Sequence, residues 1–389
     1  MPERYRSPTK RYWTLEKAGR IFKGMPRSDA RKPRVLILSD LPPTEAKRRS
    51  ETERFASLAR ALARGGLEAE HAFAGDEAAL GALLAATKPD LAFSAALMSA
   101  PEAGAASGPG PRGRRNMHEL LEEAGVPYVG SEPAVLELAI DKAALKERWR
   151  EAGVASPAFL SLHPGEALDE ARARALGFPC IVKPSREGNS RGLGEDSVVR
   201  DLPSLRKRVE AAARDYGAVL VERFLGDFPD IREFTAALLG SGPGALVLPV
   251  EIKLSSAKAV RLVTTEDKDG HRTAALPIDD AALRARVAAF ARRAFAAAGT
   301  RDYARCDLLL AGGEIQAIEI NGQPMLPDLW FEACCATAGL GAEAYPNAVF
   351  LAALARLARS PGTAFPRIPD AMRDIVPAPV YEALAGQEA

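Results

Sequence analysis

The pattern of apolar segments changes character at Gly153, and this change constrains the fold more than any other feature of the sequence. Before Gly153, short apolar strands alternate with amphipathic helices. Strands are predicted near 35–38, 69–74, 90–95 and 127–129, and helices near 51–64, 76–87, 116–124 and 133–152. Such alternation indicates a parallel sheet with helices on its faces.

After Gly153 the predicted strands come in pairs, which is typical of antiparallel sheets. Strands are predicted near 180–184, 197–200, 219–224, 233–239 and 245–251, with helices near 202–215 and 279–298. This is an α+β pattern with helices to one side of the sheets. The expected parts are a basic N-terminal extension (1–33), an α/β domain (34–130), two α+β domains (131–228 and 229–358) and a C-terminal tail (359–389).

The composition excludes several classes of protein. The 389 residues are 47% hydrophobic and 26% charged with a net charge of +1, which is ordinary for a soluble globular protein. A general nucleic-acid binder needs a concentrated positive face, which this balance does not supply. No apolar run approaches the ~20 residues of a membrane helix, and the basic N-terminus lacks the apolar segment of a signal peptide. We therefore expect a cytoplasmic protein without membrane or nucleic-acid partners.

Cysteines and histidines show no pattern of a metal site. The four cysteines lie in apolar contexts without metal-ligand spacing, and buried thiols are expected. The histidines lack the spacing of a metal site or a catalytic triad, so surface or helix-face positions are expected for His71, His118, His163 and His271.

A lysine followed by a glycine-rich loop is the most informative motif. A buried strand delivers Lys183, and the polar loop that follows contains Gly188 and Gly192. Glycines let backbone N–H groups approach an anion closely, and a lysine beside such a loop suits a polyphosphate. A β-hairpin with a flexible polar turn is the alternative that this segment alone leaves open.

Two later strands carry a second group of polar residues. Strand alternation places Arg305 and Asp307 on one face of the first strand, and Glu319 and Asn321 on one face of the next. The two faces coincide only if the connecting loop holds an odd number of residues, such as 311–313. Asp, Glu and Asn are hard oxygen ligands that suit Mg²⁺. The pattern therefore predicts a Mg²⁺ site beside a permanent cation, with a solvated sheet face as the alternative.

Two further acids, Glu222 and Glu233, stand next to predicted strands. Either acid alone fits a surface position. Together with the lysines, the glycine-rich loop and the Mg²⁺ hairpin, they indicate a nucleotide site.

Six ordered segments resemble the D-alanine–D-alanine ligases of the ATP-grasp superfamily: 126–131, 141–142, 181–192, 233–235, 305–307 and 319–321. The resemblance runs from about Pro127 to Pro324, roughly half of the chain. It implies a three-part architecture of α/β and α+β type. An N-terminal parallel-sheet domain would precede a central lid domain and a C-terminal antiparallel-sheet domain, with the nucleotide between the last two.

The resemblance implies that several residues bind ATP. Glu222 would lie by the adenine, and Glu233 would bind the ribose hydroxyls. The residues expected at the phosphates are two lysines and a loop closing over the β- and γ-phosphates: Lys142, Lys183, Gly188, Asn189, Ser190 and Gly192. The family's mobile-loop lysine would be Lys268, with Lys253 and Lys258 as the alternatives.

The resemblance implies the remaining roles as well. Asp307, Glu319 and Asn321 would hold two Mg²⁺ ions, for which Mn²⁺ is a candidate substitute. Arg305 would stabilise the acyl phosphate and the tetrahedral intermediate. Acyl-phosphate chemistry needs positioning and charge neutralisation rather than a nucleophilic side chain.

The substrate half departs from the family. Residues 39–45 replace its Gly-Gly-x-Ser-x-Glu segment, and residues 94–113 replace its His-Gly-x-x-Gly-Glu-Asp-Gly loop. Trp330 and Phe331 stand where the family has a Ser-Leu pair that receives the second substrate's carboxylate. Met325 and Trp330 are therefore expected on the substrate side, near groups that are bulkier or less charged than D-alanine.

The expected protein is an ATP-dependent ligase that joins a small-molecule carboxylate to an amine, releasing ADP and phosphate, with substrates other than two D-alanines. One alternative is a genuine D-alanine–D-alanine ligase of cell-wall synthesis with a divergent substrate half. Another is a non-catalytic ATP-binding protein that retains the fold, although a binding protein has little need for Arg305. Such ligases often dimerise, so a homodimer is a further expectation.

Overall fold

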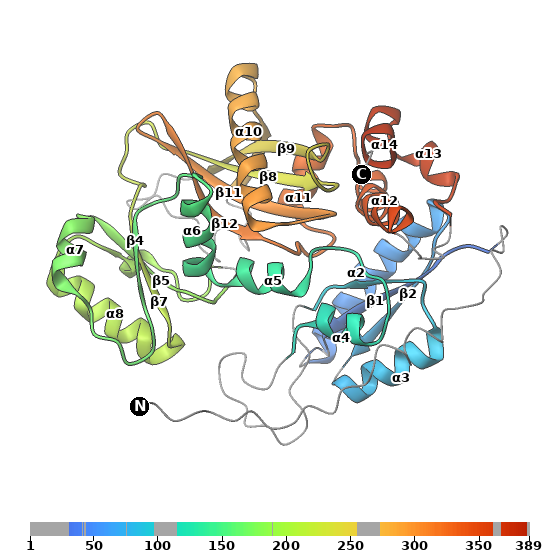
Figure 1. Cartoon of the computed structure of the whole chain (residues 1–389), viewed down its shortest axis with the longest axis horizontal. Helices are drawn as coiled ribbons and strands as arrows, with labels where there is room; N and C mark the ends of the chain where they lie inside the picture. The colour runs from blue at the N-terminus through green and yellow to red at the C-terminus, as the bar shows by residue number, and fades with distance from the viewer. Residues whose placement is uncertain are drawn as a thin grey trace, which may run out of the picture.

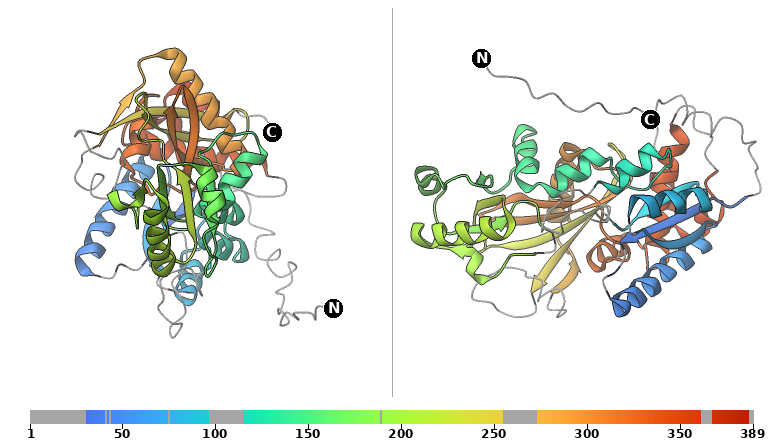
Figure 2. Two further views of the ribbon diagram at one scale, coloured as in Figure 1. Left: turned by 90° about the vertical axis from the view of Figure 1, so that its left-hand side faces the viewer. Right: turned by 90° about the horizontal axis from the view of Figure 1, so that it is seen from below.

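The computed structural model describes residues 31–40, 42, 44–74, 76–96, 115–188, 190–254, 273–360 and 367–386. Within these ranges the chain forms one parallel and two antiparallel sheets with helices packed around them (Figures 1 and 2). Three residues of the predicted site, Asn189, Lys258 and Lys268, lie outside the described residues. The predicted combination of α/β and α+β architecture is confirmed, whereas the domain boundaries stay a prediction.

The three-stranded parallel sheet has the order β2-β1-β3, formed by Glu68–Ala74, Arg34–Asp40 and Leu91–Ser94. The helices α2 (Glu45–Arg64), α3 (Glu77–Thr87) and α4 (Met117–Glu123) accompany it. Thr44 and Asp76 cap α2 and α3 by accepting hydrogen bonds from the first turn, which explains where these helices begin. The predicted strand near 127–129 is reduced to a single parallel bridge between Ala92 and Tyr128.

The long helix predicted over 133–152 is wrong, because the structure has two helices there, α5 (Pro133–Ile140) and α6 (Lys142–Glu151). Asp141 separates them with an extended backbone at ψ 93°, and its carboxylate accepts a hydrogen bond from Ala144 N at 3.1 Å. An aspartate in this position satisfies an N–H group that the first turn of a helix leaves open. The break makes Lys142 the first residue of α6.

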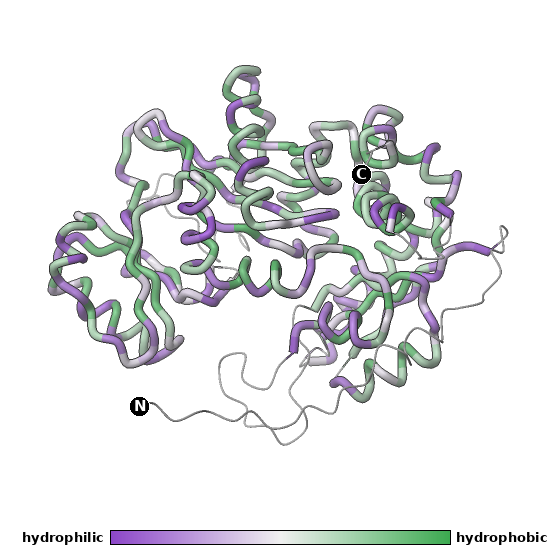
Figure 3. The backbone as a smooth tube through the Cα atoms, in the orientation of Figure 1, coloured by the Kyte–Doolittle hydropathy of each residue, from purple (hydrophilic) through white to green (hydrophobic). Residues whose placement is uncertain are grey.

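The four-stranded antiparallel sheet has the order β4-β7-β5-β6, formed by Phe159–Leu162, Val219–Arg223, Cys180–Pro184 and Val198–Val199. The helices α7 (Glu170–Leu176) and α8 (Leu202–Tyr216) pack on it, and the short 3-10 helix Glu195–Ser197 precedes β6. Residues along β5 and β7 are mainly hydrophobic (Figure 3) and form one core with α8. The polar side chains of these two strands are therefore the exceptions that need an explanation.

The five-stranded antiparallel sheet has the order β10-β9-β8-β11-β12. Its strands are Thr273–Pro277, Leu246–Leu254, Arg232–Leu239, Tyr303–Ala311 and Glu314–Asn321. Alternate residues of β8 and β11 enter two different cores. The core with α10 (Ala281–Ala298) takes Cys306 and Leu308 of β11, and the core with α11 (Leu329–Ala336) takes Tyr303. Arg305 and Asp307 therefore share the face of Tyr303.

The C-terminal helices join the first and last sheets. The helix α12 (Ala344–Arg359) is buried along most of its length, against α2, α13 (Ala371–Ile375) and α14 (Ala378–Ala385). At its end Arg356 donates two hydrogen bonds to the fully buried Asp302, at 2.7 Å each. Asp302 also accepts a hydrogen bond from Gly130 N at 2.8 Å. None of the helices in the described part of the chain is long and apolar enough to cross a membrane.

Candidate active site

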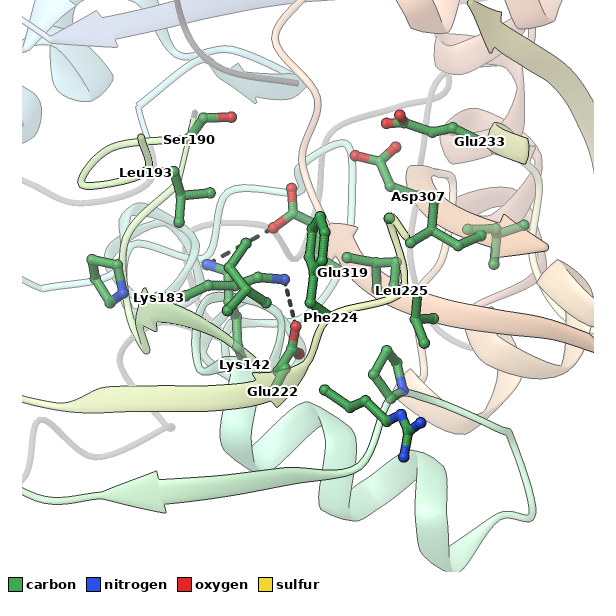
Figure 4. A pocket seen from close by; sticks show the side chains of 18 of the residues that line it. Lys142, Lys183, Ser190, Leu193, Glu222, Phe224, Leu225, Glu233, Asp307 and Glu319 are labelled. Carbon is green, nitrogen blue, oxygen red and sulfur yellow. Dashed lines mark hydrogen bonds and ion pairs between the residues drawn. The ribbon is translucent and has the colours of Figure 1, made fainter. Parts of the chain in front are cut away.

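A cleft of about 1070 Å³, including the part that is open to solvent, is lined by residues of the four-stranded and five-stranded sheets. It brings together many of the residues predicted for the nucleotide site: Lys142, Lys183, Ser190, Glu222, Glu233, Asp307, Glu319 and Trp330. Figure 4 shows that the lysines and Glu222 approach it from one side, and that Asp307 and Glu233 lie across from them. Arg305, Asn321 and Met325 do not line the cleft, although all three belong to adjoining segments.

A buried ion-pair cluster forms one wall of the cleft. Glu222 on β7 is 1% exposed, and its two carboxylate oxygens lie 2.5 Å from Lys183 Nζ and 2.7 Å from Lys146 Nζ. Burial acts to raise the pKa of Glu222, but the two ammonium groups outweigh it and lower the pKa to about 2. Burial also lowers the pKa of Lys146, which Glu222 partly offsets. Two lysines against one carboxylate leave the cluster with a net positive charge.

Sequence reasoning missed Lys146, which is fully buried. Its spacing from Lys142 was the available signal, because residues four apart on a helix share one face. On α6 the two lysines point to neighbouring parts of the site. Lys142 Nζ lies 3.8 Å from Glu319 Oε2 (Figure 4). It also donates a hydrogen bond to the Glu187 carbonyl oxygen. Lys142 thus links the loop after β5 to strand β12.

The loop after β5 turns sharply at its end. Ser190 and Gly192 have positive φ angles of 58° and 73°, a region that favours glycine. A Cβ atom on Gly192 would lie 2.8 Å from Pro184 and 2.9 Å from Tyr216, whereas a Cβ atom on Gly188 would meet nothing within 4 Å. Gly192 is therefore required by the close packing of the turn, and Gly188 is not.

The hairpin β11–β12 has Asp307 and Glu319 on one face, as predicted, but the cause is not the predicted loop length. The loop holds two residues, Gly312 and Gly313, with φ angles of 59° and 79°, so the predicted odd-numbered loop is wrong. The register shifts after Asp307, which pairs with Glu319, while Leu308 pairs with Ala317. This β-bulge supplies the extra residue and returns both carboxylates to one face.

Arg305 is held by two acids and one ring. Its Nη1 lies 3.0 and 3.1 Å from the two carboxylate oxygens of Asp328, and its Nε lies 3.3 Å from Asp307 Oδ1. The centre of its guanidinium lies 5.1 Å from the ring centroid of Trp330. Burial acts to lower the pKa of Arg305, but Asp307 and Asp328 raise it far above its ordinary value. Sequence reasoning missed Asp328, which also caps α11 through Phe331 N.

The predicted metal ligands differ in their surroundings. Asp307 and Glu319 are direct partners across the hairpin and both line the cleft, which suits two hard carboxylate ligands. Asn321 Oδ1 instead accepts a hydrogen bond from Gln323 N at 3.1 Å. No group of three or more His, Cys, Asp or Glu side chains within the described ranges is placed to hold a metal ion. The two carboxylates fit Mg²⁺ if phosphate oxygens and water complete its coordination.

The other predicted residues lie further out. Met325 is 38% exposed, and its Sδ lies 2.6 Å from Arg54 Nη1 of α2. Lys253 on β9 is half-exposed and lies 4.0 Å from Glu251.

His118 lies on α4, which fits the helix-face branch of the expectation, and its side chain is turned into the core. It is fully buried, stacks on Tyr128 with ring centroids 4.2 Å apart, and its Nδ1 lies 2.7 Å from the Ser131 carbonyl oxygen. Burial lowers its pKa to about 4, so the ring is neutral at pH 7. Gln323 Nε2 lies 3.2 Å from His118 Nε2, which ties the segment after β12 to α4. The four cysteines are buried and free, as predicted.

The family model described as "D-ala D-ala ligase C-terminus" matches residues 149–345, which is just over half of the chain. The chain belongs to the D-alanine–D-alanine ligase family. The match spans β4 to the start of α12 and so includes most of the cleft. The predicted family resemblance is confirmed.

Two curated relatives of this family show how far the likeness extends. The D-alanine–D-alanine ligase of Ralstonia pickettii is 37% identical over 212 residues, which cover 53% of this chain and 60% of the relative. The D-alanine–D-alanine ligase of Ralstonia nicotianae is 35% identical, with the same shares covered. The chain therefore spans about 60% of the length of these relatives.

Solved structures extend the likeness to more of the fold. The D-alanine–D-alanine ligase of Bacillus anthracis superposes with a TM-score of 0.64 at 20% identity, covering 83% of this chain and 98% of that protein. The VanG D-Ala:D-Ser ligase of Enterococcus faecalis gives a TM-score of 0.59 at 18% identity, covering 83% and 100%. These superpositions confirm the predicted ATP-grasp architecture.

Proposed function

We propose that this protein is an ATP-dependent ligase that joins a carboxylate to an amine through an acyl phosphate and releases ADP and phosphate. The observation that carries the proposal is the pairing of opposite charges across one cleft. A positive cluster formed by Lys183, Lys146 and Glu222 faces two carboxylates, Asp307 and Glu319, with Lys142 between them. A nucleotide triphosphate with a divalent cation has the matching charges.

The chemistry explains why no nucleophilic side chain is needed. A carboxylate is a poor electrophile, and transfer of the γ-phosphoryl group makes an acyl phosphate that an amine attacks. This transfer depends on positioning and charge neutralisation, which Lys142 and Lys183 supply at the phosphates. Arg305 is buried and permanently charged, so it can stabilise negative charge that develops on the reacting acyl group.

Mg²⁺ fits Asp307 and Glu319 and would neutralise phosphate charge when bound. Asn321 would join them only if its side chain released Gln323 N. The proposal includes two Mg²⁺ ions at this site and the ability of Mn²⁺ to replace Mg²⁺. The adenine would lie near Glu222 and the ribose near Glu233, as the family resemblance implies.

We propose substrates other than two D-alanines, because Trp330 takes the place of a small serine beside Arg305. A D-alanine–D-alanine ligase with a divergent substrate half is the alternative. The substrates would be small molecules met in the cytoplasm, where ATP is abundant. Dimerisation stays a prediction.

The test is release of ADP and phosphate from Mg²⁺ATP, screened against D- and L-amino acids and small carboxylates. The proposal expects release that requires a carboxylate donor and is lost in Arg305→Ala. Turnover with D-alanine as sole substrate would support the D-alanine–D-alanine alternative. Binding of ATP without release across the whole panel would instead favour a non-catalytic ATP-binding protein.

A further inference from the structure

At the Arg305 end of the cleft, two carboxylates already contact the guanidinium through its Nε and Nη1 atoms. Both oxygens of Asp328 contact Arg305 Nη1, and Asp307 contacts its Nε. Arg305 is only 8% exposed. Asp328 cannot move away easily, since its Oδ1 also accepts a hydrogen bond from Phe331 N at 2.7 Å and so caps α11. An acceptor carboxylate on the Asp328 side of Arg305 would therefore face a fixed negative charge, whereas Nη2, which neither acid contacts, is left for the acyl group.

Three of the four other cations that line the described part of the cleft lie near acids. Among the lining residues that the structure describes, Lys142 lies near Glu319, Lys183 contacts Glu222 and Arg191 lies 3.3 Å from Glu187. The fourth, Arg223 at the end of β7, is exposed and has its guanidinium beside Gly177.

Arg54 on α2 is a cation near the substrate side. Its Nη1 lies against Met325 Sδ, and Arg54 does not line the cleft.

The large, mainly apolar side chain of Trp330 limits the space at the same end of the cleft. It is 7% exposed, lines the cleft and presents its ring to the Arg305 guanidinium. An indole offers one N–H donor and a large apolar surface. It therefore favours an alkyl or aromatic group over a carboxylate, which would lose its hydration beside Asp328.

We infer that the acceptor substrate is an amine whose α-carbon carries no carboxylate, such as an amino-acid amide or an arylalkyl amine. This inference rests on the proposed ligase function and names the class of its second substrate. The amine attacks the acyl carbon, the C–N bond forms, the C–O bond to phosphate breaks, and phosphate leaves as the amine loses a proton. Trp330 and Asp328 act as specificity determinants in this step.

The experiment first finds the donor without using any natural acceptor. Hydroxylamine carries no carboxylate and traps an acyl phosphate as a hydroxamate, so it identifies carboxylates that the enzyme activates with Mg²⁺ATP. Matched acceptors are then compared with that donor: D-alanine with D-alaninamide, L-alanine with L-alaninamide, and L-phenylalanine with phenethylamine. The inference expects kcat/KM at least about 10-fold higher for the member without the carboxylate, in one or more pairs.

Variants test whether Trp330 and Asp328 cause the preference. Trp330→Ser and Asp328→Asn are each expected to lower the ratio of kcat/KM between the acceptor without a carboxylate and its carboxylate-bearing counterpart at least about 3-fold. Asparagine can still cap α11, so Asp328→Asn removes the charge and keeps the helix start. Leu329→Ser is the matched control, because Leu329 is 64% exposed on the same helix. It should leave both hydroxamate formation and the preference unchanged. The hydroxamate assay also shows whether each variant still folds and activates the donor.

The outcomes separate the two proposals. Hydroxamate formation together with equal or better use of the carboxylate-bearing acceptors would overturn this inference and leave the ligase standing. Loss of that acceptor activity in Arg54→Ala would then assign the carboxylate to Arg54. Absence of hydroxamate with every donor, despite bound ATP, would overturn the ligase proposal and this inference with it.

Discussion

Replacing Glu222 with glutamine is expected to destabilise the protein by about 3 kcal/mol at pH 7. Glu222 is buried between Lys146 and Lys183, with contacts of 2.7 and 2.5 Å. Glutamine keeps the shape of the side chain but removes its charge, so two ammonium groups would share a buried site without a counter-ion. Breaking a buried ion pair by removing one partner typically costs about 3–5 kcal/mol.

The pKa of Glu222 supports the same magnitude. The neighbouring lysines outweigh burial and lower this pKa from 4.5 to about 2. A difference of about 2.5, at roughly 1.4 kcal/mol for each pKa unit, corresponds to about 3 kcal/mol. Because the pKa is lowered in the folded state, the stabilisation is present above the unfolded pKa of 4.5 and is lost as pH falls towards 2.

Urea unfolding followed by far-UV circular dichroism at pH 7, 5, 4 and 3 measures both effects. The difference between the wild type and Glu222→Gln should be largest at pH 7 and should shrink below pH 5. Glu210→Gln is the control, since Glu210 is exposed on α8, and it should change stability by less than about 0.5 kcal/mol. A loss below about 1 kcal/mol at pH 7, or a difference that does not depend on pH, would refute the reasoning.

Three further changes have expected outcomes. Arg305→Ala should lower donor-dependent ADP release about 10²–10³-fold while leaving ATP affinity within a factor of about three, and an unchanged rate would rule out its role at the acyl group. Asp302→Ala removes the buried carboxylate that pairs with the partly buried Arg356 and should cost about 3–5 kcal/mol in urea unfolding; a cost below about 1 kcal/mol would contradict the pairing. Gly192→Ala should cost about 1–3 kcal/mol and weaken ATP binding measured by calorimetry, whereas Gly188→Ala should be close to neutral. Equal effects of the two glycine variants would count against the tight turn.

The sheets could be predicted from the sequence because their patterns are local. Alternation of apolar strands and amphipathic helices indicated the parallel sheet, and paired strands after Gly153 indicated the antiparallel ones. The break at Asp141 could not be predicted from such patterns. An aspartate fits either the exposed face of a helix or its N-cap. In the structure its other carboxylate oxygen pairs with Arg186 at 2.9 Å, which is a contact between distant segments.

Site residues could be predicted where the alternation along a single strand places them. They could not be predicted where their position depends on contacts between several elements. Asp307 and Glu319 followed from strand alternation, although the bulge that aligns them leaves no mark in a period-two pattern. Lys146 belongs to the site because it pairs with Glu222 on β7, and Asp328 because it pairs with Arg305 on β11. The burial of His118 similarly depends on tertiary contacts.

Transfer of labelled oxygen tests the central claim most directly. A donor carboxylate enriched in ¹⁸O is incubated with the protein, Mg²⁺ATP and an amine, and the phosphate released is analysed by mass spectrometry. Formation of an acyl phosphate predicts one ¹⁸O atom in each phosphate, because the C–O bond that breaks leaves the donor's oxygen on phosphorus. Phosphate released in step with ADP but free of ¹⁸O would show attack by water on ATP and would contradict the account.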